Sequence, residues 1–467
     1  MSKVRQASAS AKVPHNNLPF LSIEHSDTVI ESLGTAKIES PLLREPDQLS
    51  IQPFINEGEG VLINIKTNLL AEMLKKGKLP PSFELAGPRR QIYFDPSKLR
   101  CGLVTCGGLC PGLNDIIRSV VLELYYHYGV RKIFGIRYGL QGFIAEYGHD
   151  IIDLSPRRVS NILDMGGSIL GSSRGAQSIE AIVDCLDRMA IGILFMIGGD
   201  GTLKAAKKIA DEVTERQLKI SIVGIPKTID NDIHMLSRSF GFDTAVDVAT
   251  QAIISAHNEA TAYPNGIGLI KLMGRYSGFI AATATLAQQD VNFVLIPEVD
   301  FDLEGDNGLL SVLDRRLKAR GHAVIVVAEG AGQKYFEGQK SEMDESGNIR
   351  LKDIGLFMKS KISQYFDSKG IEINLKYIDP SYMIRSLPAN ANDSVFCGFL
   401  GRDAVHAGMA GKNKLLIGHW NNHFVHVPIS LSVGKRKQVN PTGKLWSTVL
   451  ESTGQGSLKN DSPAPTT

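Results

Sequence analysis

A glycine-rich stretch with one acidic residue, Gly-Gly-Asp-Gly-Thr at 198–202, stands between an apolar run at 192–197 and a helical pattern at 203–214. Three glycines cost backbone entropy, so the bare backbone must come close to something. A phosphate bound at a helix N-terminus, with Asp200 as the ligand of a divalent cation, explains both features. A tight strand–helix turn explains the glycines alone and leaves Asp200 without a role.

A pair of carboxylates follows another apolar run, in IPKTIDNDI at 225–233. Asp230 and Asp232 are two residues apart, and Lys227 and Thr228 come just before them. Paired carboxylates can divide their work, since one can accept a proton from a hydroxyl while the other helps to hold a cation. The alternative is an Asp-Asn-Asp turn, which would need neither the lysine nor the threonine.

Other motifs also follow apolar runs. In VTCGGLCPGLNDIIR at 104–118, a Gly107-Gly108 turn precedes a helix start, which is as typical of plain topology as of a phosphate loop. In GGSILGSSRGAQ at 166–177, Arg174 lies among small residues whose amides can bind phosphate, although a solvated arginine fits equally well. Further candidates are Met273, Gly274 and Arg275 in KLMGRYSGFIA, Glu329 in VVAEGAG, and Tyr382 and Arg385 in YIDPSYMIRS.

The elements that must position these residues alternate from residue 103 onward. The expected strands are CGLVT, KIFGI, GILFMI, ISIVGI, IGLIKL, NFVLI and HAVIVVA, and the expected helices cover 113–126, 203–214, 244–259 and 277–288. Such alternation predicts an α/β fold with parallel sheets covered by helices on both faces. Ligands collect beyond the carboxyl ends of the strands in these folds, and every motif above falls there.

The bulk properties limit the class of function. The 467 residues, 43% of them hydrophobic, allow two or three domains. A net charge of +2 gives no reason to expect nucleic acid, so any anion site should be local. The five cysteines favour buried thiols in a reducing compartment over disulfides or zinc ligands. No apolar run reaches the roughly 18 residues of a membrane span.

The two ends of the chain differ from its middle. Residues 1–95 lack sustained periodicity except for a helical stretch near 64–75, and we interpret them as an N-terminal extension. The first 23 residues are basic and serine-containing, as in a short transit peptide, but acidic residues from Glu24 onward favour an untargeted disordered arm. Residues 461–467 are polar and contain proline, as expected of a flexible tail.

Taken in order, the motifs CGGLCPGLN, GSSRG, GGDGT, PKTIDND, KLMGR, AEGAG and SYMIR closely resemble those of the 6-phosphofructokinase family. The similarity runs from about residue 98 to about residue 430 and includes CGFLGRDAVHAGMAG at 397–411. Among its branches, the chain looks most like the ATP-dependent enzymes of plants and trypanosomatids. An NAD or lipid kinase would explain GGDGT but not PKTIDND together with MGR.

The resemblance implies two similar three-layer α/β/α, Rossmann-like domains with the active site in the cleft between them. The ATP-binding domain would cover 96–241 with a return segment at about 386–430, and the fructose 6-phosphate domain 242–385. Residues 1–95 would be an extension and 431–467 a C-terminal segment with its tail. The resemblance also implies a glycolytic, allosteric, cytoplasmic homotetramer whose partners are ATP and fructose 6-phosphate, with no nucleic acid or membrane.

The same resemblance assigns roles to single residues. Asp230 matches the general base, and Thr228 matches a residue that flanks it. Arg174 and Arg275 would neutralise the charge that builds up on the phosphoryl group during transfer. An ordinary aspartate has its pKa well below neutrality, so we expect Asp230 to be ionised. The implied Mg²⁺ ligands are Asp200 and Asp232; the nucleotide contacts are Gly108, Tyr138, Arg174, Gly175, Gly199, Asp200, Gly201, Thr202 and Lys227; and the sugar-phosphate contacts are Thr228, Asp230, Met273, Gly274, Arg275, Glu329, Lys376, Tyr382 and Arg385.

The phosphoryl donor depends on Gly201 and Lys227. In pyrophosphate-using relatives, an Asp at the position of Gly201 excludes the α-phosphate of ATP by bulk and charge. Lys227 resembles those relatives, but a cation tolerates either donor, so we expect ATP. The alternatives are a pyrophosphate-dependent phosphofructokinase and a non-catalytic, nucleotide-binding regulatory paralogue.

Further departures from bacterial members concern the sugar site. Tyr382 replaces a histidine, and Gly266 stands where an arginine reaches the neighbouring subunit's substrate. Lys376 can still supply the other cation that crosses between subunits. The intersubunit part of the site is therefore expected to differ here.

Overall fold

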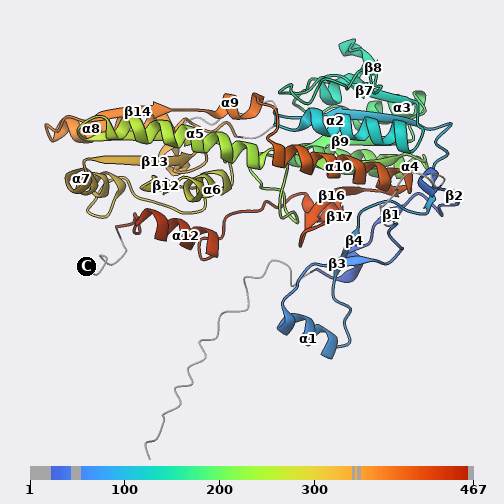
Figure 1. The fold of residues 1–467 in the computed structure, drawn as a ribbon, viewed down its shortest axis with the longest axis horizontal. Coiled ribbons are helices and arrows are strands. Elements are labelled where there is room, and N and C mark those ends of the chain that lie inside the picture. The colour runs from blue at the N-terminus through green and yellow to red at the C-terminus, as the bar shows by residue number, and fades with distance from the viewer. Residues whose placement is uncertain (1–22, 44–53, 339–341, 344–348, 461–467) are drawn as a thin grey trace, which may run out of the picture.

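The protein consists of two α/β units that lie side by side (Figure 1). This computed structural model describes residues 23–43, 54–338, 342–343 and 349–460. The predicted transit peptide or disordered arm at residues 1–22, and the predicted tail at 461–467, lie outside the described residues. Within the described part of the chain, no helix is both long enough and apolar enough to cross a membrane.

The first unit is built on a sheet with the order β3-β4-β17-β16-β10-β9-β6-β7-β8. Its central strands are parallel: β6 (Arg100–Thr105), β7 (Lys132–Ile136), β9 (Ile193–Gly198), β10 (Ser221–Pro226) and β16 (Leu415–Trp420). Every residue of β9 and β10 is buried. Burial on both faces explains why these two strands are continuous apolar runs rather than alternating ones.

The edges of this sheet are antiparallel, so the expectation of wholly parallel sheets was wrong there. The antiparallel strands are β3 (Gly60–Leu62), β4 (Ser82–Leu85) and β17 (His423–Pro428) at one end of the sheet and β8 (Ile151–Asp153) at the other. β16 and β17 form a hairpin whose turn residues Asn421 and Asn422 both have positive φ, a conformation that asparagine tolerates. A two-residue turn of this kind can join only antiparallel strands.

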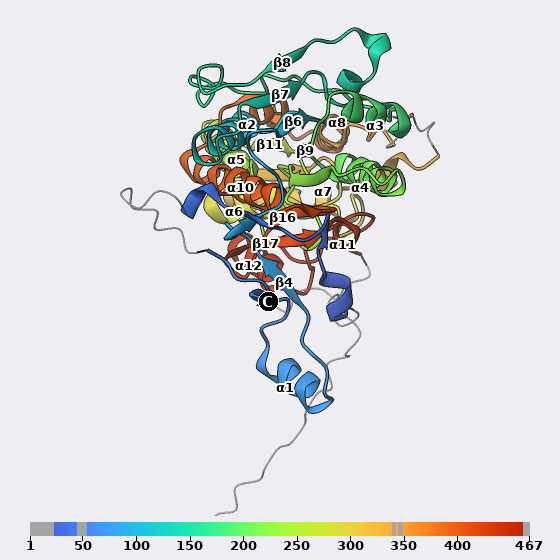
Figure 2. The same ribbon diagram turned by 90° about the vertical axis from the view of Figure 1, so that its right-hand side faces the viewer.

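Helices cover both faces of the first sheet (Figure 2). One face carries α2 (Leu113–Leu122), continued by a π-turn at Glu123–His127, and α10 (Ala391–Met409). The other face carries α3 (Ile179–Arg188) and α4 (Asp200–Glu215). Shorter elements of this unit are the 3-10 turns Gly139–Phe143 and Ala145–Tyr147 and the helix α11 (Ile429–Ser432).

The second unit has a parallel sheet with the order β12-β13-β11-β14. Its strands are β11 (Gly266–Leu272), β12 (Phe293–Leu295), β13 (His322–Ala328) and β14 (Asn374–Ile378). Its helices are α5 (Phe242–Thr261), α6 (Phe279–Ala287), α7 (Leu309–Arg320), α8 (Ile354–Ser368), α9 (Ser381–Ser386) and α12 (Lys444–Thr453), with a 3-10 turn at Gln333–Phe336. The two sheets with their helix layers are the two Rossmann-like units expected from the sequence.

The N-terminal extension contributes strands to the first unit. Its strands β3 and β4 join the large sheet, and β1 (Glu31–Ser32) pairs with β15 (Lys412–Asn413). A second short pair joins β2 (Ile38–Glu39) to β5 (Gln91–Ile92). The expected helical stretch forms α1 (Thr67–Lys75), which projects away from both units (Figures 1 and 2). Two 3-10 turns complete this region, at His25–Thr28 and Pro41–Leu43.

Candidate functional site

Three neighbouring parallel strands of the first unit end at one edge, and the predicted phosphate loops follow them directly. Lys227, after β10, donates its backbone N–H to Gly198 O at 2.9 Å, at the end of β9. The Nζ of Lys227 donates to Gly108 O at 2.7 Å, beyond the end of β6. Burial lowers the pKa of Lys227. The lysine therefore ties together the loops after all three strands.

The GSSRG loop at 171–175 is fastened to the same edge. Gly107 N donates to Ser173 O at 3.1 Å, and Ser172 Oγ donates to Gly107 O at 2.6 Å. A Cβ on Gly171 would lie 2.8 Å from the ring of Tyr138, so the close approach of that aromatic ring requires glycine. The loop ends at Arg174, which is exposed, and at Gly175, whose φ of +91° also favours glycine.

The loop after β9 leads into α4, which begins at Asp200. Gly199 is the residue before the helix, and Thr202, in its first turn, is buried. Gly201 is exposed, and a Cβ built on it would have open space around it to 4 Å. The first turn of α4 thus presents free backbone N–H groups, which together with the helix dipole can receive an anion.

Asp200 and Asp232, predicted as metal ligands, are bridged by one guanidinium. Arg436 Nη1 lies 2.5 Å from Asp232 Oδ2, and its Nη2 lies 3.5 Å from Asp200 Oδ2. Asp232 also accepts a hydrogen bond from Thr228 Oγ1 at 3.0 Å, and Lys204 pairs with Asp200 at 2.8 Å. One guanidinium therefore contacts both carboxylates.

These residues fit a divalent cation that is shared with a phosphate ligand. Among the described residues, no group of three or more His, Cys, Asp or Glu side chains is arranged to hold a metal by itself. Mg²⁺ is commonly bound by one or two carboxylates together with substrate phosphates and water. Asp200 and Asp232 supply two such carboxylates, from the ends of two adjacent strands.

Asp230 lies where the two units meet. Ser277 Oγ, from the second unit, donates to Asp230 O at 3.0 Å, and Thr228 Oγ1 accepts from Asp230 N at 3.1 Å. The Oδ1 of Asp230 is buried and has no hydrogen-bond partner among the described residues. Burial, together with Asp232 and Glu329 nearby, raises the pKa of Asp230 to about 8. The expectation that Asp230 has the pKa of an ordinary aspartate was therefore wrong.

The second unit contributes side chains from the carboxyl ends of its own strands. Met273, Gly274 and Arg275 follow β11, and Glu329 follows β13. Glu329 N donates to Leu272 O at 2.9 Å, which holds these two strand ends together. Tyr382 and Arg385 lie on α9, after β14; Tyr382 is 79% exposed, and Arg385 Cζ lies 5.5 Å from its ring centroid.

A cavity of about 910 Å³ collects side chains of both units, although Asp200, Asp230 and Asp232 are not among the residues that line it. Among the residues that line it are six predicted site residues: Arg174, Met273, Arg275, Glu329, Tyr382 and Arg385. A Cβ placed on Gly108 would lie 3.9 Å both from Arg174 Nη2 and from Arg385 Cζ. Arginines from the two units thus converge above the glycine loop of the first unit.

Two positions that bear on the intersubunit part of the site, Lys376 and Gly266, are not among the residues that line the cavity. Lys376 does not line the cavity; it lies against Glu259, with 3.9 Å between Nζ and Oε2. Gly266 begins β11, and a Cβ there would lie 1.9 Å from Ala260 O, so this position cannot carry an arginine without moving the backbone.

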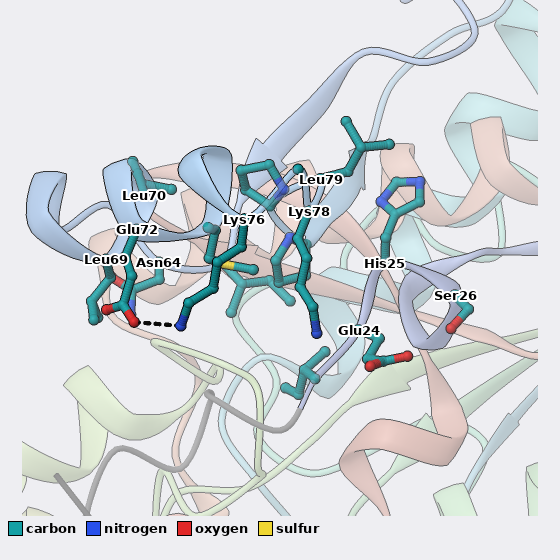
Figure 3. Close-up of a pocket in the computed structure, with 16 residues that line it drawn as sticks. Glu24, His25, Ser26, Asn64, Leu69, Leu70, Glu72, Lys76, Lys78 and Leu79 are labelled. Carbon is teal, nitrogen blue, oxygen red and sulfur yellow. Dashed lines mark hydrogen bonds and ion pairs between the residues drawn. The ribbon is translucent and has the colours of Figure 1, made fainter.

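A second cavity, of about 590 Å³, is lined only by residues of the N-terminal extension, between positions 23 and 81 (Figure 3). Lys76 and Glu72 form an ion pair of 2.6 Å on its wall. It contains none of the predicted site residues. The larger cavity is therefore the candidate active site.

Two charged residues near the site were not predicted. Lys271 lines the cavity and pairs with both Asp353 and Asp379 at 2.8 Å. It lies two residues before Met273, so the KLMGR motif itself could have indicated it. Arg436 belongs to a basic cluster, GKRKQ, in the segment interpreted as C-terminal, and no local sequence pattern connects it to the carboxylates.

The fold and the site together define a two-unit α/β phosphate-binding protein whose site lies at facing strand ends. The model of the family described as Phosphofructokinase matches residues 100–408. The chain is 50% identical over 449 residues to the ATP-dependent 6-phosphofructokinase of Borreliella burgdorferi, covering 94% of this chain and 99% of that one. It is 48% identical over 380 residues to ATP-dependent 6-phosphofructokinase 1 of Arabidopsis thaliana, covering 80% of each. The chain belongs to the phosphofructokinase family.

Solved structures agree on the fold. The crystal structure of a pyrophosphate-dependent phosphofructokinase from Marinobacter aquaeolei matches with a TM-score of 0.62 and 20% identity. The match covers 77% of this chain and 92% of that one. A yeast phosphofructokinase, from Saccharomyces cerevisiae, matches with a TM-score of 0.58 and 22% identity over 76% of this chain and 47% of that one.

Proposed function

We propose that the protein is an ATP-dependent 6-phosphofructokinase. It transfers the γ-phosphoryl group of MgATP to the 1-hydroxyl of fructose 6-phosphate, giving fructose 1,6-bisphosphate and ADP. The observation that carries this proposal is that arginines of both units, Arg174 and Arg385, lie beside the glycine loop at Gly108. Asp230, from the loop after β10 of the first unit, contacts the second unit through Ser277. The division of the chain into an ATP domain at 96–241 and a sugar-phosphate domain at 242–385 is part of the proposal.

The first unit binds the donor. Its helix N-terminus at Asp200, the bare backbone at Gly201 and the loops at Gly108 and Gly175 suit a polyphosphate, because backbone N–H groups can approach its oxygens without steric hindrance. Lys227 adds a buried positive charge beneath these loops. We assign Tyr138, whose ring lies beside Gly171 of the GSSRG loop, to contact with the nucleoside.

The second unit binds the acceptor. Arg385 and Tyr382 hold the 6-phosphate, since a guanidinium–phosphate bond is charge-assisted. Glu329, partly buried after the end of β13, accepts hydrogen bonds from sugar hydroxyls. Met273 lines the cavity beside it, and Gly274 follows in the same loop. This arrangement directs the 1-hydroxyl toward Asp230.

Asp230 acts as the general base and removes the proton of the 1-hydroxyl as that oxygen attacks the γ-phosphorus. Arg174 and Arg275, one from each unit, neutralise charge that develops on the transferring group, and Thr228 holds the loop in place. Asp200 and Asp232 hold Mg²⁺, which supplies charge neutralisation of the donor phosphates when it is bound.

The open space around Gly201 supports ATP over pyrophosphate as the donor. A side chain at this position would project from the first turn of α4, into the region where an α-phosphate meets the helix N-terminus.

We also propose a homotetramer in the cytoplasm. In support, Lys376 lies outside its own cavity, where it can serve a neighbouring subunit, and the five free cysteines are buried, as suits a reducing compartment.

A donor comparison tests the proposal. The purified protein is supplied with fructose 6-phosphate and either MgATP or Mg-pyrophosphate, and the sugar product is identified by ³¹P NMR. We expect fructose 1,6-bisphosphate with ATP and little or none with pyrophosphate. Faster turnover with pyrophosphate would favour the pyrophosphate-dependent alternative, and no turnover with either donor would favour a regulatory, non-catalytic paralogue.

A further inference from the structure

The C-terminal segment at 436–439 passes directly over the proposed metal carboxylates. Arg436 makes the ion pairs to Asp232 and Asp200 described above, at 2.5 and 3.5 Å. Its Cζ also lies 4.3 Å from the ring centroid of Tyr276, next to Arg275. Its side chain is 31% exposed, so the guanidinium is inside the site rather than on the open surface.

Backbone contacts fix this segment independently of the guanidinium. Lys437 N donates to Asp232 O at 2.8 Å, and Arg436 forms a β-bridge with Ile233. On the other side, Gln438 Nε2 donates to Tyr276 O at 3.2 Å, and Val439 N donates to Glu298 Oε1 at 2.8 Å. The segment therefore links the loop after β10 to the loops after β11 and β12 of the second unit, and these contacts fix the position of Arg436.

The atoms that Arg436 engages are the ones a metal would need. Both of its contacts are to the Oδ2 oxygen of an aspartate, whereas Thr228 uses Oδ1 of Asp232. Mg²⁺ binds carboxylate oxygens at about 2.0–2.1 Å. A divalent ion on these oxygens would face a guanidinium a few ångströms away, and two cations at that distance repel each other.

We propose that Arg436 is a positioning residue that takes the place of the divalent cation in the metal-free enzyme and competes with it. The guanidinium holds Asp200 and Asp232 together, which otherwise repel each other, and it must withdraw from their Oδ2 atoms when the metal binds. This inference rests on the proposed function, in which those two aspartates hold the metal. Competition therefore predicts two opposite effects of Arg436→Met: the protein is less stable in the absence of metal, and it binds metal more tightly.

Mn²⁺ alone is the probe. It is titrated into the metal-free full-length protein, and the unbound ion is followed by its EPR signal, for wild type, Arg436→Met and the matched control Lys204→Met. Lys204 pairs with the same Asp200 Oδ2 at 2.8 Å but is half exposed and does not reach Asp232. We expect about fivefold tighter Mn²⁺ binding in Arg436→Met and less than about twofold in Lys204→Met.

Unchanged or weaker Mn²⁺ binding in Arg436→Met would overturn the inference, as would an equal gain in Lys204→Met, which would indicate a general charge effect. Asp200→Asn, made in both the wild-type and Arg436→Met backgrounds, separates the two levels of the argument. If it leaves Mn²⁺ binding intact, the metal site of the proposed function is wrong; if it abolishes binding while Arg436→Met changes nothing, only the competition is wrong.

Thermal melting gives an independent check that a purely structural role would not reproduce. In EDTA we expect Arg436→Met to melt below wild type, and on adding Mn²⁺ to gain more than wild type does. Arg436→Lys keeps the positive charge but cannot bridge both carboxylates, so its metal affinity should lie between that of wild type and that of Arg436→Met. If Arg436→Met does not fold, Arg436→Lys provides the test. An affinity of Arg436→Lys for Mn²⁺ that is equal to or below that of wild type would contradict competition.

Discussion

The strand ends of the two units present different chemistry to the same cleft. The first unit offers mainly backbone and small residues, with Gly199 and Gly201 beside Asp200 at the start of α4 and Gly108 after β6. The second unit offers long side chains, chiefly Arg275, Tyr382 and Arg385. Both sheets are Rossmann-like, so the difference lies in the loops and not in the fold.

This contrast supports the proposed separation of donor and acceptor between the two units. A polyphosphate that binds together with a metal ion needs neutral backbone N–H groups close to its oxygens and a few carboxylates to hold the metal. The metal neutralises part of the phosphate charge, so fewer cationic side chains are needed. A sugar phosphate brings one dianionic group without a metal, and needs cationic side chains. Variants in one unit should therefore affect one substrate, and those at the meeting point should affect turnover.

The largest effect is expected from Gly201→Asp. The added carboxylate would meet the α-phosphate of ATP, and two like charges about 4 Å apart repel by about 4 kcal/mol at an effective dielectric of 20, roughly a thousandfold in kcat/KM. The open space at Gly201 predicts a normal fold, which circular dichroism can check. Gly201→Asn adds similar bulk without charge and separates the two causes. Near wild-type efficiency with ATP in the folded Asp variant would reduce Gly201 to a turn residue.

Asp230→Asn is expected to lower kcat by about 100-fold or more while both substrates still bind, because a missing base slows proton transfer rather than docking. Steady-state rates beside equilibrium binding measure this. The Oδ1 of Asp230 has no hydrogen-bond partner among the described residues, so the change should leave the fold intact. A variant that keeps more than about a tenth of kcat would remove Asp230 from the role of base.

Arg385→Ala should raise the KM for fructose 6-phosphate by about tenfold to a hundredfold, the usual range for losing a hydrogen bond to a charged group. The KM for ATP should change far less, because Arg385 lies on α9 of the second unit. Initial rates with each substrate varied in turn provide the test. Equal changes in the two KM values would contradict the separation between the units.

Lys271→Met sharpens the comparison inside the second unit. Lys271 joins Asp353, which caps α8, to Asp379, which precedes α9, and so steadies the helix that carries Tyr382 and Arg385. We expect about a fivefold rise in the KM for fructose 6-phosphate, about 1 kcal/mol, with kcat nearly unchanged. Lys334→Met, which removes the ion pair to Asp300 outside the cavity, is the control. An effect confined to kcat would argue against a positioning role.

The sequence was sufficient for the parts of the fold and site that local pattern determines. Buried strands such as β9 and β10 are continuous apolar runs, and the motifs at their ends are contiguous, so Asp200 and Asp230 could be located directly. The strand at 374–378 was not expected, because it lies at the sheet edge and every residue in it is only partly buried.

Features that depend on distant contacts could not be read in this way. Arg436 reaches Asp200 from 236 positions away, and its basic neighbours resemble an exposed cluster. The raised pKa of Asp230 arises from burial between two units, whereas the motif suggested an ordinary carboxylate.

The most direct test of the two-unit division is a pair of calorimetric titrations on Gly201→Asp and Arg385→Ala, each with MgADP and, separately, with fructose 6-phosphate. The account predicts a crossed result: Gly201→Asp loses nucleotide affinity and keeps that for the sugar phosphate, and Arg385→Ala does the reverse. If either folded variant loses both affinities to the same extent, or if the losses are exchanged, the assignment of donor and acceptor to the two units is contradicted.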